Sequence, residues 1–283
     1  MATVSQGGNS SPHVPITPHP CYRTRVPLDI DGVLDEAAWQ LAPRSPRFVE
    51  VVTGGPALYD TRAAVLWDDD YLYIGFWVEE PFVTAELRER DAIIFAENDV
   101  EVFIDGGDAY YELEINAQNT LYEVFFIWKD AFRRGGRFDV PEFDLLSRDV
   151  YTFGGNHDRS TAHFWRGDHP RGVRWAFADW DFPGLKTAVA VNGRLNDATH
   201  VDHGWTVEIA LPWAGMTWLA NGRPLPPRPG EVWRLQFARY EKLASSTQHM
   251  GWAWHPVGSQ DNHRPEAFTR IVFSDRSVQA ADQ

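Results

Sequence analysis

Acidic side chains alternate with apolar ones along the segment NDVEVFIDGGDAYYELEINAQNTLYEVFFIW, residues 98–128. Read with a period of two residues around a Gly-Gly turn, the polar positions share one face: Asp99, Glu101, Glu112, Glu114 and Asn116. The opposite face takes the aliphatic positions, which include Val100, Val102 and Ile115. Because a half-buried strand has one apolar and one solvated face, the segment predicts two antiparallel strands with a solvated face rich in carboxylates.

Carboxylates gathered on one sheet face can serve three chemical roles. Glu101, Glu112 and Glu114, with Glu123 as a further candidate, could line one concave face, and glycoside hydrolysis requires two carboxylates that flank a sugar. The same side chains could instead hold a sugar by hydrogen bonds to adjacent hydroxyls, since carboxylates are strong acceptors. Solubility alone would also place acids there, so the residues leave all three roles open.

Two further acidic clusters could act as calcium ligands, because clustered hard oxygens at turns suit that ion. They are WDDDYLY, residues 67–73, and DGGD, residues 105–108. Neither matches the twelve-residue helix-loop-helix calcium pattern, and Asp and Gly also form ordinary hairpin turns. The residues establish no cofactor, and a structural calcium ion stays an option.

Other catalytic and cofactor chemistries lack their motifs. The sequence contains no G-x-S-x-G elbow, phosphate loop or dinucleotide fingerprint. Cys21 is the single cysteine, which rules out an intramolecular disulfide and a cysteine-based zinc site. A haem-binding module is the third class that we weigh, after a binding protein and a glycoside hydrolase. It ranks last, because C-x-x-C-H is missing and Met216 and Met250 are the only methionines within the expected fold.

The chain is strongly acidic, with 26 Lys and Arg residues against 40 Asp and Glu residues and a net charge of −14. This acidity disfavours nucleic acid and anionic lipid as partners and suits a neutral or a cationic ligand. At 283 residues and 43% hydrophobic composition, the chain can bury a full core. Residues 1–20 have no charged start and no apolar run, so we expect neither a signal peptide nor a membrane span there. The oligomeric state is left open.

Short strand-like runs bounded by turn signals dominate from residue 26 onward. They predict an all-β fold, an antiparallel β-sandwich of the jelly-roll or immunoglobulin type. The expected strands cover residues 46–52, 61–67, 71–79, 98–105, 109–116, 120–128, 186–191, 204–211, 231–240 and 268–273. One helical turn is expected at residues 34–42, with Asp35 as its cap.

We expect one domain over residues 26–275, preceded by a flexible leader (residues 1–25) and followed by a tail (residues 276–283). Residues 130–183 interrupt the strand pattern with a long insertion rich in Arg, His, Asp and aromatic residues. It has too few regularly spaced apolar residues for its own core, so we expect it to fold over one edge or mouth of the sandwich. Its segment HFWRGDHPRGVRWAFADW, residues 163–180, could either contribute to a binding site or cover apolar sheet surface.

Three separated blocks carry a family resemblance. They are LDIDGVLDEAAWQLAP near the start, TRAAVLWDDDYLYIGFWVEEP followed by ENDVEVFIDGGDAYYELEINAQNT, and the terminal WAWHPVGSQDNHRPEAFTRIVFS. Together they resemble the family 9 carbohydrate-binding modules and their stand-alone relatives, over roughly residues 27–130 and 184–274. The resemblance implies a single carbohydrate-binding β-sandwich that grips the end of a glycan between aromatic platforms, without catalysis. It also implies a role in polysaccharide and carbohydrate catabolism and a secreted or periplasmic location.

The resemblance also suggests which residues bind the sugar. Phe95 stands where family members place a first platform Trp, and Glu101 matches the ligand-binding Glu of the following strand. The second platform falls near Asn262 and His263, where no Trp stands, and His263, Trp254 or a Trp of the insertion could replace it. The full candidate set for carbohydrate binding is Phe95, Glu101, Glu114, Asn116, Arg239, Trp254, His263 and Arg264.

Overall fold

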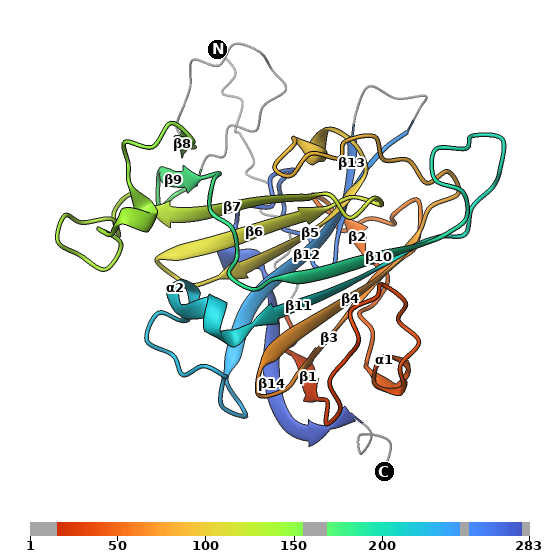
Figure 1. Ribbon diagram of the computed structural model, residues 1–283, viewed down its shortest axis with the longest axis horizontal. Helices are drawn as coiled ribbons and strands as arrows, with labels where there is room; N and C mark the ends of the chain where they lie inside the picture. The colour runs from red at the N-terminus through yellow and green to blue at the C-terminus, as the bar shows by residue number, and fades with distance from the viewer. Residues whose placement is uncertain (1–15, 155–168, 244–248, 279–283) are drawn as a thin grey trace, which may run out of the picture.

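The chain folds into two packed layers of β-strands, shown in the computed structural model of Figure 1. The structure describes residues 16–154, 169–243 and 249–278. The strands within these ranges are β1 (His19–Arg23), β2 (Val49–Glu50), β3 (Thr61–Trp67), β4 (Tyr71–Glu79), β5 (Asp99–Asp105), β6 (Ala109–Ile115), β7 (Leu121–Trp128), β8 (Val150–Phe153), β9 (Arg174–Phe177), β10 (Lys186–Asn192), β11 (Gly204–Pro212), β12 (Val232–Lys242), β13 (His249–Ala253) and β14 (Thr269–Ser277).

The helical elements are short. Two α-helices, α1 (Ala37–Leu41) and α2 (Thr217–Ala220), occur in the described ranges. The 3₁₀ turns there are η1 (Ile94–Ala96), η2 (Pro141–Phe143), η3 (Trp213–Met216) and η4 (Pro265–Ala267). None of the described helices has the length and apolar character that crossing a membrane would require.

One hydrogen-bonded path connects the strands in the order β10-β11-β4-β3-β1-β14-β12-β5-β6-β7-β9-β8. The pairings along it are antiparallel except at β1, which runs parallel to both β3 and β14. The path folds back on itself. A contact between the two halves shows this: Phe76 on β4 packs against Phe237 on β12, with ring centroids 6.1 Å apart. The strands β3, β4, β10 and β11 thus form one layer over β12, β5, β6 and β7. This arrangement confirms the predicted all-β sandwich.

The space between the layers holds the main hydrophobic core. Val100, Val102 and Ile104 of β5 enter it together with Leu113 and Ile115 of β6. The predicted apolar face of residues 98–116 is therefore the inner face of the sandwich. Removing these aliphatic side chains from water is the main contribution to stability, at roughly 25 cal/mol for each Å² buried.

The first block of the family resemblance, residues 28–43, packs on the outer face of the other layer. Glu208 on β11 accepts a hydrogen bond from Trp39 Nε1 at 2.8 Å and two more from the backbone N–H groups of Asp31 and Gly32. Gly32 has φ +86°, and a Cβ atom there would lie 2.6 Å from the carbonyl carbon of Val189 on β10. Only glycine fits this close approach between backbones.

Most predicted strands match the structure within about two residues, and the exceptions are local. The strand expected at residues 46–52 shortens to the two-residue β2. Helix α1 begins at Ala37, and its N-cap Glu36 makes no side-chain capping bond, so the assignment of Asp35 as cap is wrong. The predicted leader, residues 1–25, contains strand β1 (His19–Arg23). The folded domain therefore begins before the predicted start at residue 26. Strand β14 continues to Ser277, two residues into the predicted tail.

The long insertion is built into the sandwich. Its strand β9 pairs with β7, and β8 pairs with β9, so the two strands extend one layer of the sheet. Phe143, Phe177 and Trp180 of the insertion enter the main core. Residues 155–168, which include part of the aromatic segment discussed above, lie outside the described residues.

Gly32→Ala is expected to destabilise the protein by roughly 2–5 kcal/mol. A left-handed alanine costs about 1–2 kcal/mol, and the clash with β10 adds about 1–3 kcal/mol. Gly230→Ala is the matched control, because Gly230 has φ +88° and a Cβ atom there would meet no atom within 4 Å; it should lose only the backbone penalty. Urea denaturation followed by Trp fluorescence compares the two, and equal losses would contradict the close approach at Gly32.

Candidate functional site

A cavity of about 470 Å³ opens on the outer face of the layer that contains β5, β6, β7 and β12. Its volume falls within the roughly 300–1,000 Å³ of small-molecule sites. The acids that line it are Asp91, Glu101, Glu112, Glu114 and Asp261. The aromatic side chains that line it are Phe95, Phe103, Tyr122, Phe126, Tyr151, Phe153, Tyr240 and His263. The cavity thus combines carboxylates with flat rings.

Three carboxyl groups lie close together on this sheet face, and two of them line the cavity. Glu101 on β5 lies directly opposite Glu114 on β6 in the antiparallel register. Each of Asp99, Glu101 and Glu114 offers a carboxylate oxygen that lies within 4.8 Å of the others, and we call these residues the acidic triad. Glu101 and Glu114 line the cavity itself, whereas Asp99 lies behind them.

The acidic triad is buried, and this corrects the prediction of a solvated face. The residues Asp99, Glu101 and Glu114 are only 0%, 5% and 2% exposed. Segments distant in sequence cover them: Asn262 donates its Nδ2 to Glu101 Oε2 at 3.0 Å and to the hydroxyl of Tyr240 at 3.2 Å. The alternation along the strands predicted the correct sheet face for these acids. It did not predict that other segments of the chain bury that face.

Burial changes the ionisation of these acids. It raises the pKa of the Glu101 carboxyl to about 8, although the hydrogen bond from Asn262 opposes the rise. Burial, followed by repulsion from neighbouring carboxylates, raises the pKa of Asp99, Glu112 and Glu114 well above the ordinary range. Neutral carboxylic acids can donate as well as accept hydrogen bonds, which suits them to contacts with hydroxyl groups.

His263 closes one side of the cavity. Its Nδ1 lies 3.0 Å from the hydroxyl of Tyr110 and its Nε2 lies 3.4 Å from Glu112 Oε1. Arg174 donates to the backbone oxygen of His263 at 2.9 Å and to the Tyr110 hydroxyl at 2.9 Å. Burial and the charge of Arg174 lower the pKa of His263 well below its usual value, so the ring is neutral at pH 7.

Four of the predicted binding residues line the cavity: Phe95, Glu101, Glu114 and His263. Phe95 is half-buried, and its ring meets that of Tyr122 edge to face at 5.7 Å. The side chain of His263 is only 11% exposed, so it forms part of the cavity without a broad open face. The aromatic and acidic groups that the resemblance suggested therefore do meet at one place.

Asn116 is not a cavity residue. Its Nδ2 donates to the backbone oxygen of Leu87 at 2.9 Å and to Glu97 Oε1 at 2.7 Å, while its Oδ1 accepts from the N–H groups of Gln118 and Thr120. All of its hydrogen-bonding capacity is used to hold the turn after β6 against residues 87–97. The prediction that Asn116 binds sugar directly is wrong, and its role is to position the segment that carries Phe95.

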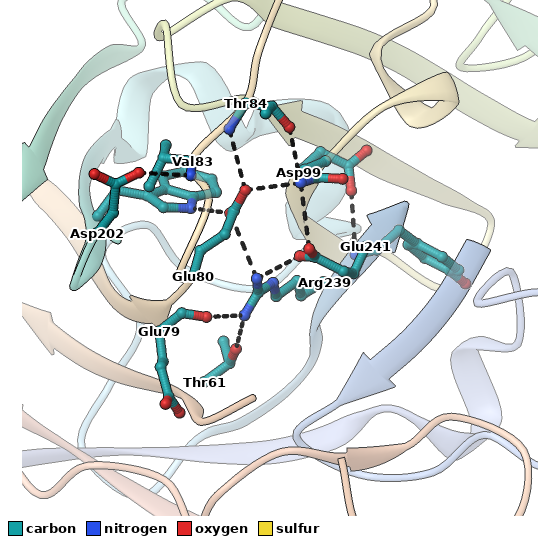
Figure 2. A network of polar contacts seen from close by, with 12 residues as sticks. Thr61, Glu79, Glu80, Val83, Thr84, Asp99, Asp202, Arg239 and Glu241 are labelled. Atoms are coloured by element: carbon teal, nitrogen blue, oxygen red, sulfur yellow. Dashed lines mark hydrogen bonds and ion pairs between the residues drawn. The ribbon is translucent and has the colours of Figure 1, made fainter. Parts of the chain in front are cut away.

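Arg239 lies on the inner face of β12, in the buried polar network of Figure 2. Its Nη1 donates to Thr61 Oγ1 at 3.1 Å and to the backbone oxygen of Glu79 at 2.7 Å, and its Nη2 pairs with Glu80 and Glu241. The predicted binding role of Arg239 is therefore wrong: the side chain compensates two buried carboxylates within the sandwich.

Trp254, Arg264 and Glu123 also lie away from the cavity. The ring of Trp254 packs against that of Phe237 at 5.0 Å, at the border of the core. Arg264 donates to Glu266 and to the backbone oxygen of Val257. Glu123 points to the inner face, where it accepts hydrogen bonds from the Tyr111 hydroxyl and the N–H of Phe182. Inner-face packing and local pairing explain these three corrections.

Several cavity residues had no sequence signal that singled them out. Tyr151 and Phe153 belong to β8, so the insertion contributes to the cavity lining. Tyr240 follows the inward-facing Arg239 on β12, and strand alternation turns it outward. Alternation along β12 could have found Tyr240, whereas Asn262 lies outside any strand and could not be placed without the fold.

In the two acidic clusters that were weighed as calcium ligands, Asp68 and Asp105 accept turn hydrogen bonds. Asp68 accepts from the backbone N–H groups of Asp70 and Tyr71 and from the hydroxyl of Tyr73, at 2.7–2.8 Å. Asp105 accepts from the N–H of Gly107 at 2.8 Å and pairs with Arg234. Ordinary turn geometry accounts for both clusters.

Comparisons with known proteins agree with this architecture. Residues 30–139 match the family model described as Carbohydrate family 9 binding domain-like, which confirms the resemblance over that part of the chain. A candidate carbohydrate-binding protein from Bacteroides uniformis ATCC 8492 has a similar structure, with a TM-score of 0.56 and 14% identity over 92% of this chain and 100% of that one. No curated protein matches the sequence.

Two further similar structures show a family 9 carbohydrate-binding module from Caldicellulosiruptor kristjanssonii. One is in complex with glucose, at a TM-score of 0.50 and 15% identity over 92% of this chain and 97% of that one. The other is in complex with cellotriose, at a TM-score of 0.50 and 16% identity over 93% of this chain and 97% of that one. At these identities the likeness establishes the shared β-sandwich fold.

Arg239→Met is expected to destabilise the protein by about 3–5 kcal/mol, because it leaves Glu80 and Glu241 buried without their cation. Arg270→Met, at an exposed position on β14, should stay within about 0.5 kcal/mol of the parent. Guanidinium denaturation of both variants measures the difference. A loss at Arg239 no larger than that at Arg270 would show that the network of Figure 2 does not support the fold.

Glu101→Gln is expected to gain stability relative to the parent as the pH rises. Between the ordinary pKa of 4.5 and the folded value of about 8, the folded parent keeps a proton that the unfolded chain releases, so the parent loses stability with rising pH. The amide of glutamine does not ionise. The difference in unfolding free energy, variant minus parent, should grow by roughly 4 kcal/mol between about pH 5 and pH 9, at about 1.4 kcal/mol for each pH unit up to the folded pKa of about 8.

Urea denaturation across that pH range provides the measurement. Glu89→Gln is the control, because Glu89 is exposed and its substitution should give a difference that does not change with pH. Comparing each variant with the parent at the same pH removes the opposite contribution of His263, whose lowered pKa favours the folded state as the pH rises towards neutrality. A constant difference for Glu101→Gln would contradict the buried state of this carboxyl.

Proposed function

We propose that this protein is a non-catalytic carbohydrate-binding protein that holds the end of a glycan or oligosaccharide in the cavity above the acidic triad. The main support is the meeting of aromatic rings and hydrogen-bonding carboxyl groups in one cavity of about 470 Å³. A sugar ring has an apolar C–H face that packs on flat rings and an edge of hydroxyl groups that requires donors and acceptors. The cavity offers both the flat rings and the hydrogen-bonding groups.

Different residues are suited to contact different parts of the sugar. Phe95, half-buried in the cavity lining beside Tyr122, offers an aromatic surface for the sugar face. Glu101, Glu114 and Asn262 offer carboxyl and amide groups at the bottom for the hydroxyls. Hydroxyl pairs on adjacent sugar carbons act as donor and acceptor together, which carboxyl and amide groups match.

The family match and the similar structures support the same assignment. The family model that matches residues 30–139 describes a carbohydrate-binding domain. The similar module from Caldicellulosiruptor kristjanssonii is in complex with glucose in one structure and with cellotriose in the other, which supports a sugar as the ligand class here. A role in carbohydrate catabolism and a secreted or periplasmic location belong to the same proposal and are supported by the family resemblance alone.

The glycoside hydrolase alternative finds no support in the arrangement of the acids. Hydrolysis needs two carboxyl groups on opposite sides of the scissile bond, about 5–10 Å apart. Glu101 and Glu114 are cross-strand neighbours on one surface, with oxygens within 4.8 Å of each other. A sugar above them would contact both from the same side, which is the geometry of recognition.

Phe95→Ala is expected to weaken sugar binding by about tenfold, because the variant loses the contact between the ring and the sugar face. A glycan array with the parent protein first identifies bound glycans, with glucose and cellotriose included as probes. Calorimetry then compares Phe95→Ala with Phe82→Ala, which removes an exposed phenylalanine outside the cavity and should bind as the parent does. If the parent binds no glycan on the array, the proposed function fails; if Phe95→Ala binds as tightly as the parent, only the role of Phe95 fails.

A further inference from the structure

The acidic triad gathers more carboxyl groups than the recognition of neutral hydroxyl groups requires. Other buried carboxyl groups have their own partners: Glu80 and Glu241 pair with Arg239, and Glu208 accepts three hydrogen bonds. Within the described residues, no Lys, Arg or His nitrogen lies within ion-pair distance of Asp99, Glu101 or Glu114. Burial and mutual repulsion instead dominate the ionisation of Asp99 and Glu114. Burial favours the protonated forms of these acids, and a carboxyl group that ionises there has no cation nearby within the described residues, so a cation from outside would pair with it.

Three oxygens of the acidic triad and of the neighbouring Asn262 lack a hydrogen-bond partner within the described residues. Asp99 Oδ2 and Glu114 Oε2 are buried without a hydrogen-bond partner in the described part of the chain. Asn262 lies on a separate segment and is 3% exposed, and its Oδ1 also has no partner, although its Nδ2 is bonded to Glu101. Buried acceptors rarely stay unpaired, because each one loses its hydrogen bonds to water. A donor-rich group bound above Glu101 would satisfy them.

An ammonium group fits this arrangement. It offers three N–H donors, and three acceptors around its nitrogen at about 2.9 Å lie about 4.7 Å apart. The oxygens of the acidic triad lie within 4.8 Å of one another. The aromatic lining, including Phe95, Tyr122 and Tyr240, adds favourable contacts for a cation, because ring faces carry partial negative charge.

A calcium ion fits less well. It takes six to eight oxygen ligands, often with backbone carbonyls among them. The acidic triad and Asn262 Oδ1 supply four side-chain groups, and the backbone groups of β5 and β6 are used in the sheet ladder. The rings that complete the lining offer no strong ligands to a metal ion.

We therefore propose that the cavity selects an amino sugar, with the ammonium group on the sugar bound by Glu101 and Glu114 above Asp99. This inference rests on the proposed carbohydrate-binding function and specifies its ligand class. In the free protein the triad holds protons, because burial disfavours its charged form. When the ammonium group enters, a triad carboxyl releases its proton to the buffer and forms an ion pair with the bound cation.

Titration calorimetry with three matched β-1,4-linked trisaccharides tests the inference on the full chain. Their sugar units are glucosamine, glucose and N-acetylglucosamine, so they differ at one ring substituent, which is an amine, a hydroxyl or a neutral amide. At about pH 6.5, with chelator present, the glucosamine trisaccharide should bind at least about tenfold more tightly than the other two. Repeating the titration in two buffers of different ionisation enthalpy should show proton release for the glucosamine ligand alone.

The nearby titratable groups are accounted for in this design. Besides Glu101 and Glu114, the titratable side chains that line the cavity are Asp91, Glu112, Tyr122, Tyr151, Tyr240, His249, Asp261 and His263. All three ligands meet these same groups at the same pH, so a difference in proton release comes from the amine. Glu114→Gln keeps the shape and removes one charge; it should lower the affinity for the glucosamine trisaccharide by about tenfold and that for cellotriose by about threefold or less. Glu89→Gln, an exposed control, should change neither.

The outcomes separate this inference from the proposed function. If cellotriose binds as tightly as the glucosamine trisaccharide, the amino-sugar inference is overturned and carbohydrate binding stands. If binding of every sugar requires added calcium and is lost with chelator, the triad holds a metal ion and the inference is also overturned. If no trisaccharide binds, the inference fails, and the glycan array decides the proposed function separately. If circular dichroism shows that Glu114→Gln does not fold, the comparison of the three ligands on the parent protein still tests the amino-sugar inference.

Discussion

The register between β5 and β6 is the interaction on which the rest of this structure depends. It places Glu101 opposite Glu114 on the outer face and Val102 opposite Leu113 on the inner face. Because side chains alternate with a period of two, a slip by one residue would move the aliphatic side chains out of the core and the acids into it. The same ladder therefore supplies both the core of the sandwich and the acidic triad.

The buried acidic side chains of this protein have two kinds of surroundings. On the inner face, Arg239 compensates Glu80 and Glu241 and ties β12 to β3 and β4 through Thr61 and the backbone of Glu79. On the outer face, the acidic triad has hydrogen bonds but no cation within the described residues. The two carboxylates of the inner network pair with Arg239, whereas the triad is left with unpaired oxygens and no cation among the described residues. That contrast separates a structural cluster from a binding surface.

The segments around the cavity are held in place by residues that do not touch it. Asn116 fixes the turn after β6 to residues 87–97, which sets the position of Phe95. Arg174 on β9 holds His263 through its backbone oxygen and through Tyr110. Glu208 and Gly32 anchor the first family block on the other layer, far from the cavity chemistry. The family resemblance therefore covers supporting residues as well as binding ones.

The sequence by itself determined what depends on local periodicity. Alternation predicted the strands, the sandwich and the opposite faces of Val102 and Glu101, because these follow from the two-residue repeat of an extended chain. The tertiary structure alone decided that the acidic face is covered, since Asn262 lies 161 residues from the Glu101 that it contacts. It also decided that Arg239 points inward and that Asn116 is fully bonded. The burial of a side chain and its hydrogen-bond partners depend on contacts between distant segments, which a local sequence pattern does not predict.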